Sequence, residues 1–323
     1  MNLNFFQIKR FALISFLGLA SFSQAQLSKQ INQYMVYQPV INFAASSSYN
    51  SITSAIYYRS QWSGFNGAPE SYGLNIAMPI KKKKSVFSSN STIGIGAYRD
   101  KIGVHKNEAI ELNYAYQMKL NRKTFLSFSL SPQIRFITAN LNLTNFNNKL
   151  DPTLNQAAVN KIAPNFKFGS YLFKKNFYFG IATSNLLYNN IDFGSLSSKI
   201  ETGFDFNRIN YFVHSGYQFL IDKKNDIIVS TLIKEGQGAA VHYNINAMWQ
   251  YMKGNIGLGV SYRSSNDLVF ITNFKIIQRF TFSYAYQHAL SSISSYENGS
   301  HEIMLLYKVK PTKQLIRIST PRF

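Results

Sequence analysis

The sequence predicts an all-β protein, a transmembrane antiparallel β-barrel of about 14 strands with short basic periplasmic turns and longer extracellular loops. Composition is the first observation behind this fold class. Charged residues make up 15% of the 323-residue chain, against about 25% in soluble proteins, and aromatic residues make up another 15%. The mean hydropathy is nevertheless close to neutral, at −0.13. This combination is typical of strands with one lipid-facing side and one polar side.

Alternation of apolar and polar residues is the second observation. In "EAIELNYAYQMKL" (108–120) the large apolar residues fall on one face, and Ala, Glu, Asn and Gln fall on the other. A strand separates such faces because successive side chains point to opposite sides. Pro132 interrupts one predicted strand, where we expect a bulge. The predicted strands span residues 48–58, 70–79, 91–99, 108–120, 124–138, 162–173, 176–185, 207–220, 225–234, 241–251, 254–263, 267–276, 278–287 and 301–309.

The connections between the predicted strands provide the third observation, because two kinds of connection alternate along the chain. One kind is short and basic, at residues 81–84, 121–123, 174–176, 222–225, 252–254 and 277–279. The other kind is generally longer, at residues 59–70, 99–107, 139–161, 186–206, 235–240, 263–267 and 288–300. Outer-membrane barrels place short turns in the periplasm and long loops outside. With a periplasmic N-terminus, the two kinds stay in register from the first strand to the last.

Residues 1–25 have the form of a secretory signal peptide. Lys9 and Arg10 precede the apolar run "FALISFLGLA", and small residues lead to Ala25. We expect cleavage between Ala25 and Gln26; the alternative is an uncleaved anchor, for which the apolar run is short. No later stretch approaches about 18 uninterrupted apolar residues, so the membrane spans must be strands.

The formal net charge of +20 implies an anionic partner such as phospholipid, lipopolysaccharide, nucleic acid or an acidic protein. The basic residues lie in the short turns instead of mixing with stacking aromatics in one groove, which argues against nucleic acid. Two interpretations remain open: a basic rim against inner-leaflet phospholipid, or a dock for a periplasmic protein. The candidate docking residues are Lys81, Lys82, Lys83, Lys84, Lys174, Lys175, Lys223 and Lys224.

Catalytic groups are scarce in the sequence. The chain has no cysteine, which excludes disulfides, thiolate metal sites and thiol catalysis. None of the five histidines belongs to a metal-binding pair, and no G-x-S-x-G context is present. The glycines at 94, 96, 254, 257 and 259 sit within alternating strands, so we expect small lumen-facing residues and not a phosphate loop. We therefore expect no enzyme activity, no metal and no cofactor.

Several motifs resemble the PorP/SprF family of outer-membrane proteins of the type IX secretion system, found in the Bacteroidetes. They include "QYMVYQPVINFA" (33–44), "YRSQWSGFNGAPES" (58–71) and "NGSHEIMLLY" (298–307), and the resemblance covers nearly the whole mature chain. The R-x-Q-W-x-G-x-x-G-A-P stretch and the G-S-H-E-I ending are the specific ones. Departures are Gln38 in place of the usual Asn, Phe43 in place of a second Pro, and Thr320 in place of a Cys near the C-terminus, so any role of that cysteine is in doubt.

The resemblance implies a barrel without catalysis that takes part in secretion and surface retention of gliding adhesins and other cargo. It implies as partners the C-terminal domain of a secreted cargo protein and the periplasmic components of the secretion system, besides outer-membrane lipid. The expected location is the outer membrane. The competing hypothesis is a general porin or small-molecule channel; a third, a barrel enzyme, predicts Ser, His and Asp clustered at the outer rim. An open lumen favours the porin, and a plugged lumen favours the attachment role.

The loop from Arg59 to Glu70 is the candidate contact site for cargo, or a segment that folds in and seals the mouth. A further alternative places Trp62 in the aromatic girdle of the barrel. If the loop folds inward, Arg59 is expected to meet a lumen carboxylate, with Glu111 as one candidate. The candidate residues of this loop are Arg59, Gln61, Trp62, Phe65, Gly67 and Pro69.

The predicted organisation has four parts. Residues 1–25 form the signal peptide, and residues 26–47 form a periplasmic or plug segment whose aromatic content is too high for a linker. Residues 48–309 form the barrel, which at this size has room for a plug. Residues 310–323 form a basic C-terminal tail, expected to meet the secretion machinery together with the short turns.

Overall fold

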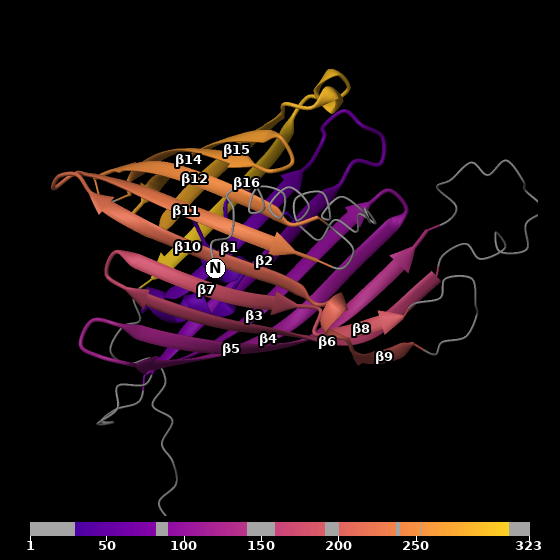
Figure 1. Cartoon of the computed structure of the whole chain (residues 1–323), viewed down its shortest axis with the longest axis horizontal. Coiled ribbons are helices and arrows are strands. Elements are labelled where there is room, and N and C mark those ends of the chain that lie inside the picture. The colour runs from indigo at the N-terminus through magenta and orange to yellow at the C-terminus, as the bar shows by residue number, and fades with distance from the viewer. Residues whose placement is uncertain are drawn as a thin grey trace, which may run out of the picture.

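A computed structural model of the chain describes residues 30–81, 90–140, 159–190, 200–236, 240–252 and 254–309. Fourteen antiparallel strands close into one barrel in the order β1-β16-β15-β14-β13-β12-β11-β10-β7-β6-β5-β4-β3-β2 (Figure 1). Within the described residues, no helix is long and apolar enough to cross a membrane. The predicted fold class is confirmed.

The barrel strands follow one another around the wall, with one small sheet outside it. The barrel strands are β1 (Ile52–Ser60), β2 (Glu70–Lys81), β3 (Asn90–Ile102), β4 (His105–Lys119), β5 (Phe125–Ala139), β6 (Val159–Lys174), β7 (Phe177–Ser184), β10 (Asn210–Leu220), β11 (Asn225–Glu235), β12 (His242–Tyr251), β13 (Ile256–Arg263), β14 (Asp267–Ile277), β15 (Phe280–Ala289) and β16 (Ser300–Val309). Strands β8 (Leu187–Asn190) and β9 (Glu201–Phe204) pair only with each other. The sequence-based prediction missed this hairpin inside the loop at 186–206.

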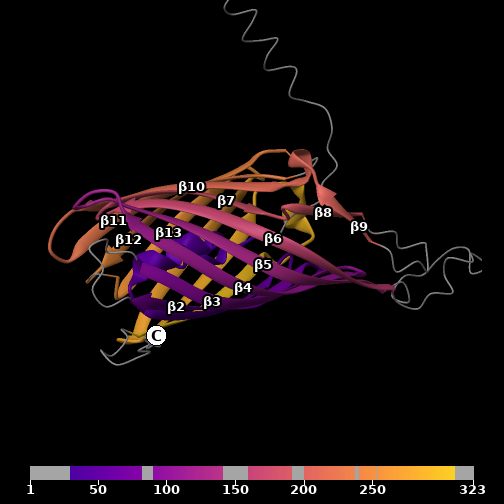
Figure 2. The same ribbon diagram turned by 90° about the horizontal axis from the view of Figure 1, so that it is seen from below.

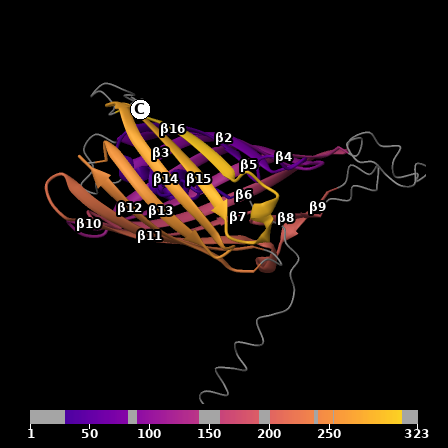
Figure 3. The same cartoon turned by 90° about the horizontal axis from the view of Figure 1, so that it is seen from above.

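The two ends of the barrel differ in their connections, and we name them accordingly. The turn end carries the connections 82–89, 120–124, 175–176, 221–224, 252–255 and 278–279. The loop end carries the connections 61–69, 103–104, 140–158, 185–209, 236–241, 264–266 and 290–299. Figure 2 shows β8 and β9 at the loop end, and Figure 3 shows the strong tilt of β14, β15 and β16 between the two ends.

The first and last strands form the seam of the barrel. Strand β1 pairs with β16 from Ile52–Val309 at the turn end to Ser60–His301 at the loop end. The alternation on β4 separates lipid from lumen as predicted, because Ile110 and Leu112 are 55% and 61% exposed while Glu111 is 9% exposed. The polar half of each amphipathic strand therefore lines the interior.

Two local expectations are wrong. Pro132 causes no bulge, because β4 and β5 keep the same register on both sides of it, at Glu111–Gln133 and at Tyr114–Leu130. The proline merely interrupts the ladder, since it has no N–H to donate. The first strand begins at residue 52 and not at 48, because residues 43–49 form a short 3-10 helix, η2, in which the Ala44 N–H donates to the capping side chain of Asn42.

The segment from residue 30 to residue 51 lies inside the barrel, and we call it the plug. It contains two 3-10 helices, η1 (Gln38–Val40) and η2 (Phe43–Tyr49), and its tyrosines Tyr34 and Tyr37 are 0% exposed. The plug begins near the loop end and runs down the lumen to the turn end, where it continues into β1. Its helix η2 packs against the wall made by β3, β4, β5 and β6.

Candidate functional site

Glu302 on β16 is the central anchor of the plug. Its carboxylate is 0% exposed and accepts hydrogen bonds from the backbone N–H groups of Asn32 (2.8 Å) and Gln33 (3.1 Å). Arg59 Nη1 on the neighbouring strand β1 donates to the same carboxylate at 3.3 Å. A buried carboxylate is tolerated only when charge and hydrogen bonds compensate its lost hydration. Here the plug and the seam of the barrel share that compensation.

A second arginine joins this network from the opposite side. Arg263, at the end of β13, donates to Gln30 Oε1 at 2.7 Å and to the side-chain oxygen of Asn32. Gln287 on β15 accepts from both Arg59 (2.8 Å) and Arg263 (3.2 Å), so it joins the two guanidinium groups. We call Arg59, Arg263, Gln287 and Glu302, with the plug residues that they bind, the latch.

The lower plug is held by polar contacts around the wall. The Tyr37 hydroxyl donates to Asn75 Oδ1 on β2 at 2.9 Å and lies 3.0 Å from Thr53 Oγ1 on β1. The Tyr34 hydroxyl accepts from Asn246 on β12. Asn42 Nδ2 donates to the carbonyl of Ser170 at 2.9 Å. The plug is thus attached to strands on several sides of the lumen, which is the arrangement of a folded core and not of a loose tail.

Glycines in the wall make room for the plug. A Cβ atom at Gly94 would lie 2.6 Å from the ring of Phe43, and one at Gly169 would lie 2.2 Å from Asn42 Oδ1. Both glycines face the lumen on strands, where only the absence of a side chain permits this approach. The expected role of Gly94 as a small lumen-facing residue is confirmed, with the plug as the reason for it.

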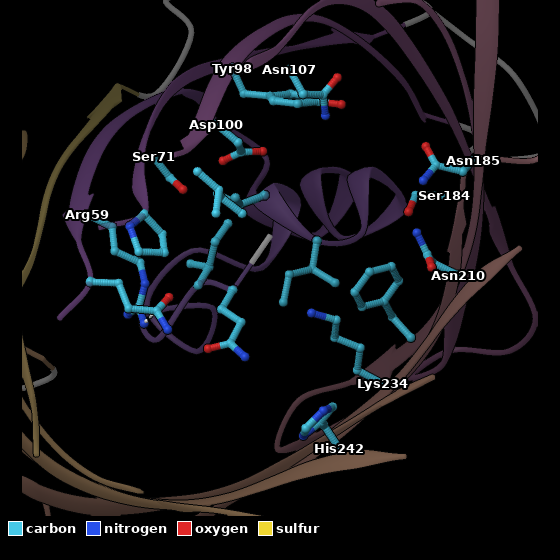
Figure 4. A pocket seen from close by; sticks show the side chains of 18 of the residues that line it. Arg59, Ser71, Tyr98, Asp100, Asn107, Ser184, Asn185, Asn210, Lys234 and His242 are labelled. Atoms are coloured by element: carbon cyan, nitrogen blue, oxygen red, sulfur yellow. Dashed lines mark hydrogen bonds between the residues drawn. The ribbon is translucent and has the colours of Figure 1, made fainter. Parts of the chain in front are cut away.

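A cavity of about 590 Å³ opens above the plug at the loop end, and we call it the vestibule (Figure 4). Its lining includes seven basic side chains but only one carboxylate, Asp100, among the described residues. The basic residues of the lining are Arg59, Lys106, Arg135, Lys167, Arg208, Lys234 and Arg263. Figure 4 shows Lys234 pointing into the middle of the cavity, with His242 nearby and Asp100 on the opposite side.

Many of these cations are paired with carboxylates that do not themselves line the vestibule. Lys167 pairs with Glu111, and Arg208 pairs with Asp205 at 3.4 Å. Arg135 differs, because it donates to the side-chain oxygens of Asn107 and Asn185, each at 3.3 Å, and pairs with no described carboxylate. The surface offered to the cavity is therefore rich in donors, and no carboxylate of the described residues compensates the charge of Arg135.

The predicted loop residues divide between the interior and the mouth. Arg59 and Gln61 are buried, Trp62 lines the vestibule, and Phe65 is 49% exposed. Gln61 N–H donates to the Pro69 carbonyl at 2.9 Å, which closes the base of the loop. Trp62 lines the lumen and so does not belong to the lipid-facing girdle.

The loop is tied to its neighbours at the loop end. Ser63 exchanges backbone hydrogen bonds with Gly299 (2.8 Å) and Asn298 (2.9 Å), and Gly67 accepts from the N–H of Gly103 at 3.0 Å. Arg59 meets a lumen carboxylate, as expected, but this carboxylate is Glu302 and not the candidate Glu111, which pairs with Lys167. Arg59 faces Glu302, because residue 59 of β1 stands directly opposite residue 302 of β16 across the seam. The two specific motifs of the sequence thus meet in one ion pair.

The comparisons with known proteins agree with this architecture. A model of the family described as "Type IX secretion system membrane protein PorP/SprF" matches residues 23–307. The chain belongs to the PorP/SprF family. No curated protein matches the chain.

Several solved structures are similar to this PorP/SprF protein at low sequence identity. A FadL homologue of Pseudomonas aeruginosa is 8% identical with a TM-score of 0.44, covering 80% of this chain and 89% of its own. The CymD monoaromatic hydrocarbon channel is 10% identical with a TM-score of 0.49, covering 86% and 92%. Omp33 of Acinetobacter baumannii is 8% identical with a TM-score of 0.43, covering 81% and 99%. The family and the fold place this protein in the outer membrane.

The turn end of the barrel carries a second concentration of charge, which we call the basic rim. Within the described residues it exposes ten basic side chains beside a single exposed carboxylate, Asp222. Of the predicted docking residues, Lys174, Lys175, Lys223 and Lys224 belong to it, and Lys81 is the last residue of β2. The basic rim consists of Lys119, Arg122, Lys123, Lys174, Lys175, Lys223, Lys224, Lys275, Arg279 and Lys308.

Some predicted features lie outside the described residues. They are the signal peptide, Lys82, Lys83 and Lys84, most of the loop at 139–161, part of the loop at 186–206, and the C-terminal tail with Thr320. Among the described residues, no group of three His, Cys, Asp or Glu side chains is placed to hold a metal ion.

The sequence-based prediction missed most of the latch and the plug contacts. Arg263, Gln287 and Asn32 were not singled out, although Arg and Gln at lumen-facing strand positions are unusual enough to mark an internal partner. What was missing is the pairing: Asn32 and Glu302 are separated by 270 positions in the sequence.

Proposed function

We propose that this protein is an accessory component of type IX secretion that retains a secreted cargo protein, such as a gliding adhesin, at the cell surface. In this proposal the loop end contacts the C-terminal domain of the cargo, and the basic rim contacts the periplasmic part of the secretion system. Membership of the PorP/SprF family supports the involvement in secretion. The proposal assigns no catalysis to the chain.

The observation that carries the proposal is the plugged lumen. The latch and the lower contacts attach the plug to β1, β2, β6, β12, β13 and β16, so the segment occupies the lumen as part of the fold. A general porin needs a continuous aqueous passage. A filled barrel with a closed seam is instead suited to present two different surfaces, one at each end.

The vestibule supports a cargo site at the loop end. It is a concave site above the plug with donors from several strands, next to the exposed Phe65 of the loop. A chain segment with carboxylates complements such a surface, because paired hydrogen bonds from arginine to a carboxylate are strong and directional. Exposed aromatic groups at the rim of the site add apolar contact area.

Affinity purification of the tagged protein from outer membranes, followed by mass spectrometry, tests the proposal. We expect a large secreted protein and periplasmic secretion components in the eluate. Arg135→Glu in the vestibule is expected to lower the recovery of cargo and to leave periplasmic components in place. Arg122→Glu in the basic rim is the matched control. Recovery of the barrel alone, together with steady ion conductance in planar bilayers, would contradict the proposal and favour the porin.

A further inference from the structure

The outer surface of the barrel has a feature that secretion does not explain, an apolar groove of about 630 Å³ on β2, β3 and β4. Ala97 forms its floor. The strand registers place Leu74 and Ile110 on either side of Ala97, and Ile95, which is 52% exposed, lies two residues further along β3. The groove exists because Ala97 has a small side chain and its outward-facing neighbours have large ones.

A charged cluster closes the groove toward the loop end. Arg99 Nε lies 3.4 Å from Glu108 Oε1, and Lys106 Nζ lies 3.1 Å from Glu108 Oε2, so two cations share one carboxylate. The Arg99 side chain is 38% exposed, and its guanidinium carbon lies 5.4 Å from the centre of the Tyr72 ring. The cluster keeps a net charge of about +1.

The charged cluster lies near the loop end of the wall. Arg99 is three residues before the end of β3 at Ile102, and Glu108 is three residues after the start of β4 at His105. Tyr58, Tyr72 and Phe136, which are 42%, 38% and 36% exposed, lie on the same outer face beside it. Aromatic residues near the end of a barrel wall are typical of the headgroup region. We therefore place Arg99 toward the headgroups, and the groove over Ala97 further along the strands toward the acyl chains.

We propose that this groove binds one acyl chain of an outer-leaflet lipid whose headgroup phosphate is held by Arg99 and Lys106. The apolar walls match the chain, and the surplus cation matches the phosphate. A neutral glycolipid fits the groove but lacks the group that pairs with Arg99. The groove is separate from the vestibule, because Ala97, Arg99 and Glu108 line the groove and not the vestibule. Lys106, at the loop end of β4, borders both.

Native mass spectrometry of the purified full-length barrel tests the site with two diacyl lipids of identical chains. Phosphatidylglycerol carries the phosphate, and monogalactosyl diacylglycerol does not. We expect one tightly retained phosphatidylglycerol, held about 3- to 10-fold more strongly than the galactolipid, as for a charge-assisted hydrogen bond at an exposed site.

Two variants separate the groove from the charge. Ala97→Leu fills the groove and is expected to lower retention of both lipids, whereas Ala247→Leu, an outward alanine on β12, leaves both unchanged. Arg99→Gln is expected to remove the preference for phosphatidylglycerol without affecting the galactolipid, and Arg99→Lys, which keeps the charge, is its control and is expected to keep the preference. Equal retention by the Ala97 and Ala247 variants, or no preference between the two lipids in the unaltered protein, overturns the proposal.

Discussion

The loop end and the turn end of this barrel use basic residues in opposite ways. At the loop end, Arg59 and Arg263 are 2% and 3% exposed. Arg263 donates to Gln30 and Asn32 of the plug, and Arg59 donates to Glu302, which accepts from the plug backbone. At the turn end, Lys174, Lys175, Lys223 and Lys224 are exposed. Buried arginines fix a geometry because leaving them unpaired is costly, while exposed lysines contribute little to stability and remain accessible to partners. The net positive charge of the chain is therefore the sum of buried arginines that hold the interior together and exposed lysines that face the solvent.

Removing the latch carboxylate is the change with the largest expected effect. Glu302→Ala leaves Arg59 and the plug N–H groups without their acceptor, at a cost of about 3–5 kcal/mol. We expect a lower unfolding midpoint in detergent and a measurable rise in ion conductance as the plug loosens. Glu108→Ala, on the outer face, serves as the control. An unchanged conductance with a normal barrel would show that the lower contacts alone hold the plug.

Gly169→Ala should come next, because the new Cβ would lie 2.2 Å from Asn42 Oδ1, which itself caps η2. Overpacking of this kind costs about 1–3 kcal/mol. Denaturant unfolding in detergent measures the loss. Gly259→Ala is the matched control, since its nearest neighbour is the mobile Met248 methyl at 3.2 Å. Equal losses for the two variants would mean that the plug is not packed tightly against β6.

Charge reversal of Lys174, Lys175, Lys223 and Lys224 is expected to change binding and not stability. These side chains are exposed, so the unfolding free energy should move by no more than about 0.5 kcal/mol. Recovery of periplasmic components with the tagged barrel should fall about tenfold, through lost electrostatic complementarity. The single reversal of Lys101 at the loop end, compared with the single reversal of Lys175, controls for the change in net charge. Unchanged recovery would leave the basic rim with a role toward lipid only.

The smallest expected effect concerns the turn at 221–224. Hydrogen bonds to Asp222 from the side chain of Asn225 and from the N–H groups of Lys224 (2.6 Å) and Asn225 (2.7 Å) lower the pKa of its carboxyl group. A lowered pKa in the folded state means that the contribution is present above the unfolded value of about 3.9 and is lost as the pH falls. The protection of the Lys224 amide against hydrogen exchange, taken relative to the rate of an unstructured peptide at the same pH, should fall on acidification. In Asp222→Asn that pH dependence should be absent; its persistence would point to another group.

The wall of the barrel was predictable from the sequence because its pattern is local. The alternation from Ile110 to Gln117 assigns every side chain to lipid or lumen, and the structure agrees. The plug was predictable only as a possibility, since the aromatic content of residues 26–47 indicates burial without naming a partner. The latch could not be predicted from the sequence, because strand order and register bring Arg59, Arg263 and Glu302 together. Even the family motifs, which contain Arg59 and Glu302, do not state that the two form a pair.

The direction of the plug constrains the order of assembly. The described part of the plug begins near the loop end and continues at the turn end into β1, while the carboxylate of its central anchor lies on β16, the last strand of the barrel in the sequence. Closing the seam therefore also supplies the buried acceptor for Arg59 and for the plug N–H groups. A barrel whose last strand has not docked has both an open edge and an incomplete latch, so the two defects are repaired by one step.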